Sequence, residues 1–362
     1  MTVNQVCGLI GCLSKLSMSH IYWRVWGKRR LDCSSVTVVA GNCAVTLLHR
    51  GVSLLITVKL QIAILQIGME APHFTGDGQQ KTIEDLFCSP DLSVGLHGHL
   101  TFLSVLNSFL SVTAFLGNAL ILNALRKESS LHPPSKLLLR SLVTTDLCVG
   151  LIAEPLTVIF LMAVVKENWS ICHYAFVTSL ITGYTLCGVS VGTLTAISVD
   201  RLLALLLGLR YRQVVTLKRT YVIVFTLWLL PAVFSSMHFW NPLITTLFGI
   251  TYIPLCRAVS FFSYTKIFET LRRHQYQVQA HVQRPNQTNQ LNIARYKKEV
   301  SSAIWLQLTL VACYLPYGVA EALQAVCGLS PSLYLAWSYA GTLVLLNSSL
   351  NPILLLLEAR WS

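Results

Sequence analysis

The stretch LLLRSLVTTDLCVGLIAEPLTVIFLMAVV, residues 137–165, decides the fold. It can cross a bilayer as a helix, because about 20 mainly apolar residues suffice. Asp146 lies in the middle of this stretch. A carboxylate at that depth costs roughly 2.5 to 3.5 kcal/mol on insertion scales, so it is rare there and usually faces partners inside a helix bundle. Function is therefore to be sought around Asp146.

The composition of the whole chain is that of an integral membrane protein. Hydrophobic residues make up 54% of the 362 residues and charged residues only 12%, against about 25% charged residues in soluble domains. Apolar runs of this kind form helices, because lipid offers no partner to the backbone. Seven such runs cover residues 99–125, 137–165, 173–207, 220–241, 243–271, 300–325 and 333–357. The sequence predicts an all-α fold, an integral membrane bundle of seven transmembrane helices.

The positions of lysine and arginine predict the orientation of the bundle, because cytoplasmic connections are enriched in both. In the second, fourth and sixth connections, Lys166 is the only lysine or arginine. The first, third and fifth are basic, and we expect them in the cytoplasm, with the N-terminal side outside. Their basic residues are Arg126, Lys127, Lys136, Arg140, Arg210, Arg212, Lys218, Arg219, Arg272, Arg273, Arg284, Arg295, Lys297 and Lys298. This asymmetry accounts for most of the net charge of +12, so the expected partner is anionic membrane lipid and no nucleic acid is required.

A glycosylation triplet agrees with this orientation. Asn168-Trp169-Ser170 falls in a connection assigned to the outside, where glycan is attached. Two other triplets begin at Asn286 and Asn347, in a cytoplasmic connection and inside a helix, and we do not expect them to be modified. Asn168 is therefore the predicted glycosylation site.

Residues 1–68 differ in character from the rest of the chain. They carry seven Lys and Arg against one acid, Asp32, and an apolar run that Lys59 interrupts. We expect that Met69 is the natural start and that 1–68 is an extension from gene prediction; an uncleaved signal anchor or a processed leader are the alternatives. Residues 69–98 are acidic and are expected to form a short, solvated external tail, followed by the transmembrane domain 99–357 and a truncated cytoplasmic tail 358–362.

Polar residues inside the predicted helices are expected to lie near one depth. They are Asn118, Asp146, Ser190, Asn347, Ser348 and Asn351. Together they offer oxygen ligands to a small hard cation, with Asp146 supplying the only charge, and such a site suits Na⁺ or a cluster of water. Taken one at a time, each residue is more often part of an ordinary interhelical hydrogen bond. The predicted metal site is Asp146, Ser190, Asn347, Ser348 and Asn351, with Asn118 in support.

The chain resembles the rhodopsin-like (class A) G protein-coupled receptors over residues 98–357. Gly117-Asn118 is similar to the family's motif in helix one, and Leu142 with Asp146 to that in helix two. The remaining motifs, in helices three to seven, are Thr195-Ala196-Ile197-Ser198-Val199-Asp200-Arg201, Trp228, Tyr264, Cys313-Tyr314-Leu315-Pro316 and Leu350-Asn351-Pro352-Ile353-Leu354-Leu355. Under this resemblance Asp146, Ser190, Asn347 and Asn351 coincide with the family's allosteric sodium site.

The resemblance implies a plasma-membrane receptor and no enzyme. An unknown extracellular ligand binds in the outer half of the bundle, helix six moves outward at its cytoplasmic end, and a heterotrimeric G protein is activated. Asp200 beside Arg201 holds the guanidinium until it is released, and Pro316 kinks helix six because it removes one helical hydrogen bond. The implied switch residues are Asp200, Arg201, Tyr264, Tyr314, Pro316, Asn351 and Pro352.

Departures from the family pattern favour an alternative reading. Leu202 replaces the tyrosine after Arg201, Tyr314 replaces a tryptophan, and Leu355 replaces the last tyrosine of helix seven. The chain also stops at Ser362, which leaves almost no room for an eighth helix. The alternative is a seven-helix receptor that couples weakly or not at all and acts as a decoy or partner.

The cysteines also depart from the family. Cys172 lies a few residues before the position of the usual outer disulfide, which Phe176 occupies, and no cysteine lies between Ser235 and Ile253. We therefore expect the usual disulfide to be absent. Cys88, Cys172 and Cys327 are on the oxidising side, so either another pair forms or Cys172 is unpaired. The nearly absent second outer loop is similar to that of melanocortin and cannabinoid receptors and is expected to leave the pocket open above.

Helix three limits the chemistry of the ligand. Gly183, next to Tyr184, occupies the position where amine receptors carry an aspartate. Glu154 and Glu321 are the acids that could line the outer cavity, although carboxylates near helix ends normally reach back to water. The candidate ligand pocket is Glu154, Gly183, Tyr184, Cys187, Tyr314, Glu321 and Trp337.

Other classes of membrane protein fit poorly. An opsin needs a lysine in helix seven for its retinal Schiff base, and residues 333–357 contain none. A transporter would show repeated halves, and an intramembrane enzyme would need a nucleophile and a base at membrane depth. Neither pattern is visible, so we predict no catalytic residues and no cofactor other than the allosteric Na⁺.

Overall fold

The computed structural model describes residues 83–127, 132–281, 309–321, 323–324 and 328–360. The chain divides into two units, Met1–Thr57 and Val58–Ser362. The first unit lies outside the described residues, as do the predictions made for residues 1–68. All statements below concern the second unit.

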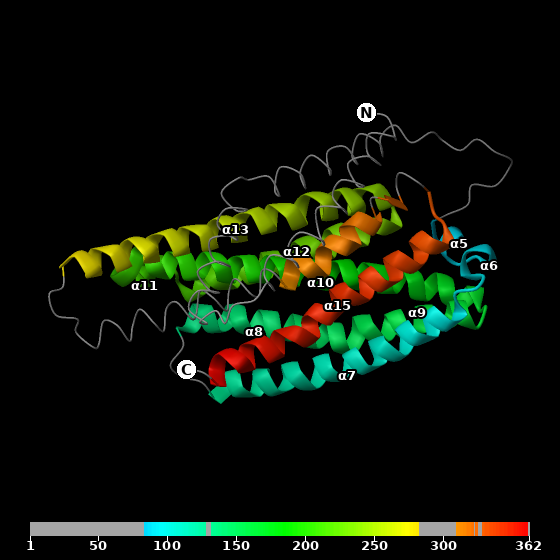
Figure 1. Ribbon diagram of the computed structural model, residues 1–362, viewed down its shortest axis with the longest axis horizontal. Coiled ribbons are helices and arrows are strands. Elements are labelled where there is room, and N and C mark those ends of the chain that lie inside the picture. The colour runs from blue at the N-terminus through cyan, green and yellow to red at the C-terminus, as the bar shows by residue number, and fades with distance from the viewer. Residues whose placement is uncertain (1–82, 128–131, 282–308, 322, 325–327, 361–362) are drawn as a thin grey trace, which may run out of the picture. The chain divides into compact units, whose positions relative to one another are not determined.

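Long helices make up the described part of this unit (Figure 1). Among the described residues, five segments are long and apolar enough to cross a membrane: His97–Lys127, Pro133–Val165, Trp169–Val214, Leu217–Phe239 and Ile244–Thr270. The helices themselves are α7 (His97–Lys127), α8 (Pro133–Cys148), α9 (Glu154–Val165), α10 (Trp169–Leu207), α12 (Leu217–Ser236), α13 (Pro242–His281) and α15 (Pro331–Arg360). Residues 309–321 are also helical and belong to the sixth predicted run. The predicted all-α bundle of seven transmembrane helices is confirmed.

Local sequence explains where several helices begin and end. Proline opens α8, α13 and α15, at the position where its missing N–H is not needed. The side chain of Asn168 caps α10 by accepting a hydrogen bond from the backbone N–H of Ile171 at 3.2 Å. Gly208 follows α10 with a φ of 49°, a conformation that glycine adopts without strain. A short turn, η2 (Gly208–Arg210), and α11 (Tyr211–Val214) connect it to α12.

Helix two contains a wide turn that the sequence did not predict. The π-helix η1 (Val149–Ala153) separates α8 from α9. Here Gly150 packs against helix one so closely that a Cβ atom would lie 2.8 Å from the backbone nitrogen of Phe115. The hydroxyl of Ser111 donates a hydrogen bond of 2.6 Å to the carbonyl oxygen of Gly150. The wide turn thus joins helix two to helix one.

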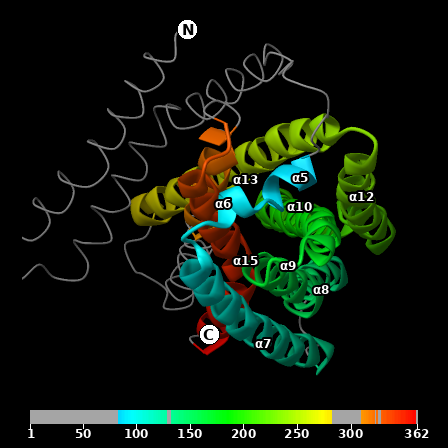
Figure 2. The ribbon, with the colours of Figure 1, turned by 90° about the vertical axis from the view of Figure 1, so that its right-hand side faces the viewer.

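Helix α10 packs against four of the other long helices described. It contacts α8, α9, α12 and α13, and Figure 2 shows it between α9 and α13. Helix α7 instead packs on α8, α9 and α15. Its free face is apolar and exposed at Phe102, Val105, Phe109, Val112, Leu116 and Leu120. Their spacing of three or four residues places them on one side of the helix, which suits contact with lipid.

One end of the bundle carries a folded N-terminal segment, which we define as residues 83–93. It comprises α5 (Ile83–Phe87) and α6 (Pro90–Ser93), which contact α10 and α15 respectively. Phe87, Cys88 and Leu92 are buried. This part of the predicted solvated tail is therefore packed on the bundle, because its apolar residues find cover there. Cys88 forms a disulfide with Cys172 here, so we call this the disulfide end. The opposite end, which carries Arg126, Lys127 and Arg212, is called the basic end.

The connection between helices four and five is short, as predicted. It consists of η3 (Met237–Phe239), Trp240 and Asn241, after which α13 begins at Pro242. Most helices begin or end a few residues away from the predicted bounds. The largest differences are that helix five continues to His281 and that helix seven continues to Arg360, into the residues assigned to the cytoplasmic tail.

Candidate functional sites in the helix bundle

Asp146 joins helix two to helix seven. It has no exposed surface. Its Oδ1 accepts a hydrogen bond of 2.9 Å from the hydroxyl of Ser348, and its Oδ2 one of 2.7 Å from the side-chain amide of Asn351. The two residues are neighbours on α15, one turn apart. The structure therefore brings together the carboxylate and two of its predicted partners.

Further oxygen atoms surround this contact without partners of their own. Ser190 lies next to Asp146 from helix three. The side-chain oxygens of Ser190, Asn118, Asn347 and Asn351 are buried and have no hydrogen-bond partner of standard geometry among the described residues. The amide of Asn118 donates to the carbonyl oxygen of Ser348 at 3.0 Å, which places Asn118 beside the group. Unpaired oxygens around one carboxylate are what a small hard cation requires.

The carboxylate of Asp200 has partners other than Arg201. The hydroxyl of Tyr211 donates to Oδ1 at 2.6 Å, and that of Ser135 to Oδ2 at 2.7 Å. Arg201 is exposed and forms no ion pair within the described part of the chain. The expectation that Asp200 holds the guanidinium is therefore not met in this structure. Tyr211, from the connection after helix three, replaces the arginine as the group that Asp200 binds.

The other predicted switch residues are spread along helices five to seven. Tyr264 on α13 packs near Leu202 and Ile267. Pro316 is exposed in helix six. Pro352 lies inside α15 against Gly117, where a Cβ atom would lie 3.0 Å from the Cβ of the proline. The position of Leu355 on α15 is described, whereas its side chain is not. These residues do not form one cluster with Asp200.

A cavity of about 120 Å³ lies between helices two, three, five, six and seven. Five of the seven predicted pocket residues line it: Gly183, Tyr184, Cys187, Tyr314 and Trp337. Most of its other lining residues are apolar, among them Phe160, Leu161, Leu180, Ile253, Val344 and Leu345. This composition is typical of a site for a small organic ligand.

The two acids predicted for the pocket are not among the residues that line the cavity. Glu321 accepts a hydrogen bond from the hydroxyl of Tyr184. Glu154 has no exposed surface, and neither of its carboxyl oxygens has a partner among the residues described. The expectation that both carboxylates reach back to water is wrong for Glu154. The extra residue in the turn η1 rotates the residues after it relative to an α-helix, so α-helical spacing from Asp146 misplaces Glu154.

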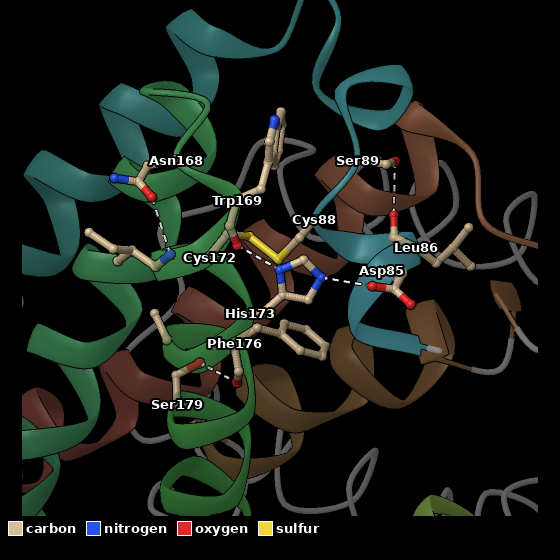
Figure 3. The surroundings of a disulfide bond; sticks show 12 residues. Asp85, Leu86, Cys88, Ser89, Asn168, Trp169, Cys172, His173, Phe176 and Ser179 are labelled. Atoms are coloured by element: carbon tan, nitrogen blue, oxygen red, sulfur yellow. Dashed lines mark hydrogen bonds and ion pairs between the residues drawn. A yellow bond between two sulfur atoms is a disulfide. The ribbon is translucent and has the colours of Figure 1, made fainter. Parts of the chain in front are cut away.

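The N-terminal segment is fixed by a disulfide between Cys88 and Cys172 (Figure 3). The structure thus selects this pair from the alternatives that the sequence left open. Beside it, His173 Nδ1 lies 2.6 Å from the carbonyl oxygen of Trp169, and Nε2 lies 2.9 Å from the carboxylate of Asp85. Both neighbours are acceptors, so the doubly protonated imidazole, which donates from both nitrogens, fits this position.

The same segment covers part of the pocket. The ring of Phe87 stacks on Phe176 with a centroid distance of 4.7 Å and meets Trp337 edge-on at 5.3 Å. Trp337 lines the cavity, so the N-terminal segment packs against the cavity wall at this residue. The short connection between helices four and five therefore does not leave Trp337 uncovered. The place of the missing outer loop is taken here by residues that precede helix one.

Sequence reasoning missed several residues of these sites. Tyr211 and Ser135 lie in or beside connections, where periodicity gives no contacts. Tyr317 lines the cavity near Tyr184 and Glu321. Arg257 lies within α13, and its two terminal nitrogens are buried without a hydrogen-bond partner in the described chain. A basic residue in the middle of the fifth apolar run was a signal that could have found it.

Comparison with known proteins places the chain in a family. The family model described as "7 transmembrane receptor (rhodopsin family)" matches residues 117–246 and 240–355. The chain belongs to the rhodopsin family of seven-transmembrane receptors. Among solved structures, squid rhodopsin superposes on this receptor with a TM-score of 0.58 and 16% identity, over 71% of this chain and 81% of that one. That likeness concerns the fold.

Curated relatives of the receptor come from several branches of the family. Melanocortin receptor 5 of Sus scrofa is 25% identical over 68% of this chain and 85% of its own length. The 5-hydroxytryptamine receptor 1E of Homo sapiens is 30% identical over 34% of this chain, and the match spans only 33% of that receptor. Adenosine receptor A2b of Gallus gallus is 30% identical over 38% of this chain and 39% of its own length. The chain is thus a multi-pass membrane receptor whose relatives bind chemically different ligands by their names.

Proposed function

We propose that the receptor converts binding of an extracellular ligand in the cavity into activation of a heterotrimeric G protein at the basic end. The observation that carries this proposal is that one helix, α15, both lines the cavity and holds Asp146. Thr342, Val344 and Leu345 line the cavity, and Ser348 and Asn351, one or two turns further, hold Asp146. A ligand that displaces this part of α15 would strain the contact between helices two and seven.

The basic end supplies the second half of the mechanism. Asp200 is bound by Tyr211 and Ser135, which leaves the Arg201 side chain exposed toward a partner. Outward movement of helix six, for which Pro316 provides the kink, would open a cavity beside Arg201. A ligand drives this change only as far as it binds the open state more tightly than the closed one.

We further propose that Na⁺ binds at Asp146. Asp146, Ser190, Asn347, Ser348 and Asn351 would hold it, with Asn118 beside them. The Asp146 carboxylate supplies the charge, and the buried hydroxyl and amide oxygens of the group that have no hydrogen-bond partner among the described residues fit the ion. When bound, the ion supplies a positive charge that offsets the buried carboxylate. The site residues then stabilise the packing of α15 against helix two. Because the ligand displaces α15, binding of the ion and binding of the ligand each weaken the other.

The proposed location is the plasma membrane, with the disulfide end outside. Lysine and arginine at the basic end suit contact with anionic lipid of the cytoplasmic leaflet. The disulfide between Cys88 and Cys172 suits an oxidising compartment at the other end.

The signalling proposal is tested by nucleotide exchange. The full chain is reconstituted in lipid nanodiscs, and its ligand-independent exchange on purified G proteins is compared with that of Arg201→Ala and of Lys166→Ala. Lys166 is an exposed basic residue at the disulfide end, away from the proposed G-protein surface, and serves as the control. We expect Arg201→Ala to lower exchange at least tenfold and Lys166→Ala to leave it near the wild-type rate. A well-folded receptor with no exchange above background would instead indicate the non-signalling alternative.

A further inference from the structure

The terminal nitrogens of Arg257 are buried, and no described residue supplies a counter-ion. Arg257 lies fifteen residues after Pro242, the first residue of α13, and so about 22 Å along this helix. Its Nη1 and Nη2 atoms are covered by protein and donate to no partner among the described residues. The ring of Tyr314 faces the guanidinium, with its centroid 5.1 Å from Cζ. A ring face compensates part of a buried charge, whereas a carboxylate would also use the unpaired N–H groups.

None of the three acids Asp146, Glu154 and Glu321 forms an ion pair with Arg257. Asp146 is held by Ser348 and Asn351, and Glu321 by Tyr184. Glu154, on helix two, has no partner either. A buried carboxyl group can accept a proton and become neutral, whereas a guanidinium stays charged in proteins. The unmet electrostatic requirement of this region is therefore for an anion.

The ligand cavity lies next to Arg257. Ile253, one turn earlier on the same face of α13, lines it, and so does Tyr314. No charged side chain is among the lining residues. The ring of Tyr314 thus borders the cavity and also faces the guanidinium. Tyrosine is smaller than the tryptophan usual at this position in the family, which leaves room for the arginine beside it.

We propose that Arg257 anchors a subsite for a carboxylate group of this receptor's ligand, reached from the cavity when the ring of Tyr314 turns aside. The inference rests on the proposed receptor function, because it names the class of ligand: a small organic acid with an apolar body. The apolar body fills the cavity, and the carboxylate accepts two parallel N–H bonds from the planar guanidinium. A lipid headgroup does not reach this site, because the terminal nitrogens are covered by protein.

The test measures thermal unfolding of the purified full chain in nanodiscs without a G protein. The probes are benzoate, two molecules of similar shape and different charge, benzyl alcohol and benzylammonium, and chloride as an inorganic anion. Sodium gluconate, which is too hydrophilic for an apolar cavity, keeps the ionic strength equal. We expect benzoate at ten times its dissociation constant to raise the unfolding temperature by roughly 2 °C, and the other three to have no effect.

Variants locate the effect. Arg257→Gln should abolish the benzoate shift, and Arg257→Lys should weaken it, because an ammonium group cannot form the bidentate pair. Arg273→Gln removes an exposed arginine from the same helix and should leave the shift unchanged. If Arg257→Gln does not fold, the comparison of benzoate with benzyl alcohol in the wild type still decides the question.

Three results would overturn the proposal. They are an equal shift with benzoate and benzyl alcohol, a benzoate shift that persists in Arg257→Gln, and an Arg257-dependent shift with chloride but none with benzoate. The last would assign the site to an inorganic ion. Because binding is read without a G protein, failure here leaves the signalling proposal standing, and failure of nucleotide exchange leaves this one standing.

Discussion

Both oxygens of Asp146 are fixed by donors from one turn of helix seven, Ser348 and Asn351. This contact could be predicted from the sequence, because polar residues are so costly among apolar ones that they must meet. The partners of Asp200 could not be predicted in this way. Tyr211 lies in a connection, where neither helical spacing nor lipid exposure restricts the path of the chain.

The sodium proposal predicts how Asp146→Asn behaves. In the wild type, replacing choline by Na⁺ should raise the stability of the purified protein by about 1.4 kcal/mol at ten times the dissociation constant. Asn has nearly the same shape and no charge, so this gain should vanish in the variant. Thermal unfolding in the two salts measures it. Asp91→Asn, at an exposed aspartate of α6, is the control, and equal gains in both variants would contradict the proposal.

Removal of one hydroxyl tests the cluster at Asp200. Tyr211→Phe deletes the 2.6 Å hydrogen bond to Oδ1 and keeps the ring. A hydrogen bond to a charged group contributes about 1.5 to 3 kcal/mol, so the unfolding temperature should fall by about 3 °C or more. Tyr221→Phe, at a tyrosine that is 57% exposed, should change nothing. A fall of the same size in both variants would mean that the bond is not the cause.

At the scale of elements, helix two shows the limit of periodicity. Its apolar run predicted one continuous helix, whereas the structure inserts the π-helix Val149–Ala153. The turn widens where Gly150 meets the backbone of helix one. Such a turn depends on a contact between distant segments, and the spacing of apolar residues within one helix carries no information about it.

Gly150→Ala should therefore be poorly tolerated. A Cβ there would lie 2.8 Å from the backbone nitrogen of Phe115 and 3.0 Å from the carbonyl oxygen of Ser111, and backbone atoms cannot move aside easily. Overpacking of this kind costs about 1 to 3 kcal/mol. We expect a lower unfolding temperature and less receptor at the cell surface. Gly318→Ala, where a Cβ meets nothing within 4 Å, should be neutral or slightly stabilising.

At the scale of the whole molecule, the class of fold could be read from the sequence with few errors. Seven apolar runs and the bias of basic residues sufficed for the bundle and its expected orientation. The fold of the N-terminal segment could not be predicted from the sequence. Three cysteines allowed several pairings, and only the packing of Phe87 on Phe176 shows why Cys88 meets Cys172.

The orientation predicts a glycan on Asn168. The residue is exposed, and its Oδ1 caps α10 while the Nδ2 that would carry the sugar is free of that bond. Ser170→Ala removes the triplet and keeps the cap. We expect glycosidase treatment to increase the gel mobility of the wild type and to have no effect on Ser170→Ala. Asn286→Gln should behave as the wild type does, and a glycan at residue 286 would invert the orientation.

The bond between Cys88 and Cys172 joins residues that are 84 positions apart and flank the first two transmembrane helices. During translation the earlier thiol must wait, unreacted, until both of those helices have emerged from the ribosome and entered the membrane. Oxidation thus reports that the first two helices have inserted in the correct order. A newly made chain with a mispaired or free Cys88 is one that cellular quality control has a chemical reason to retain.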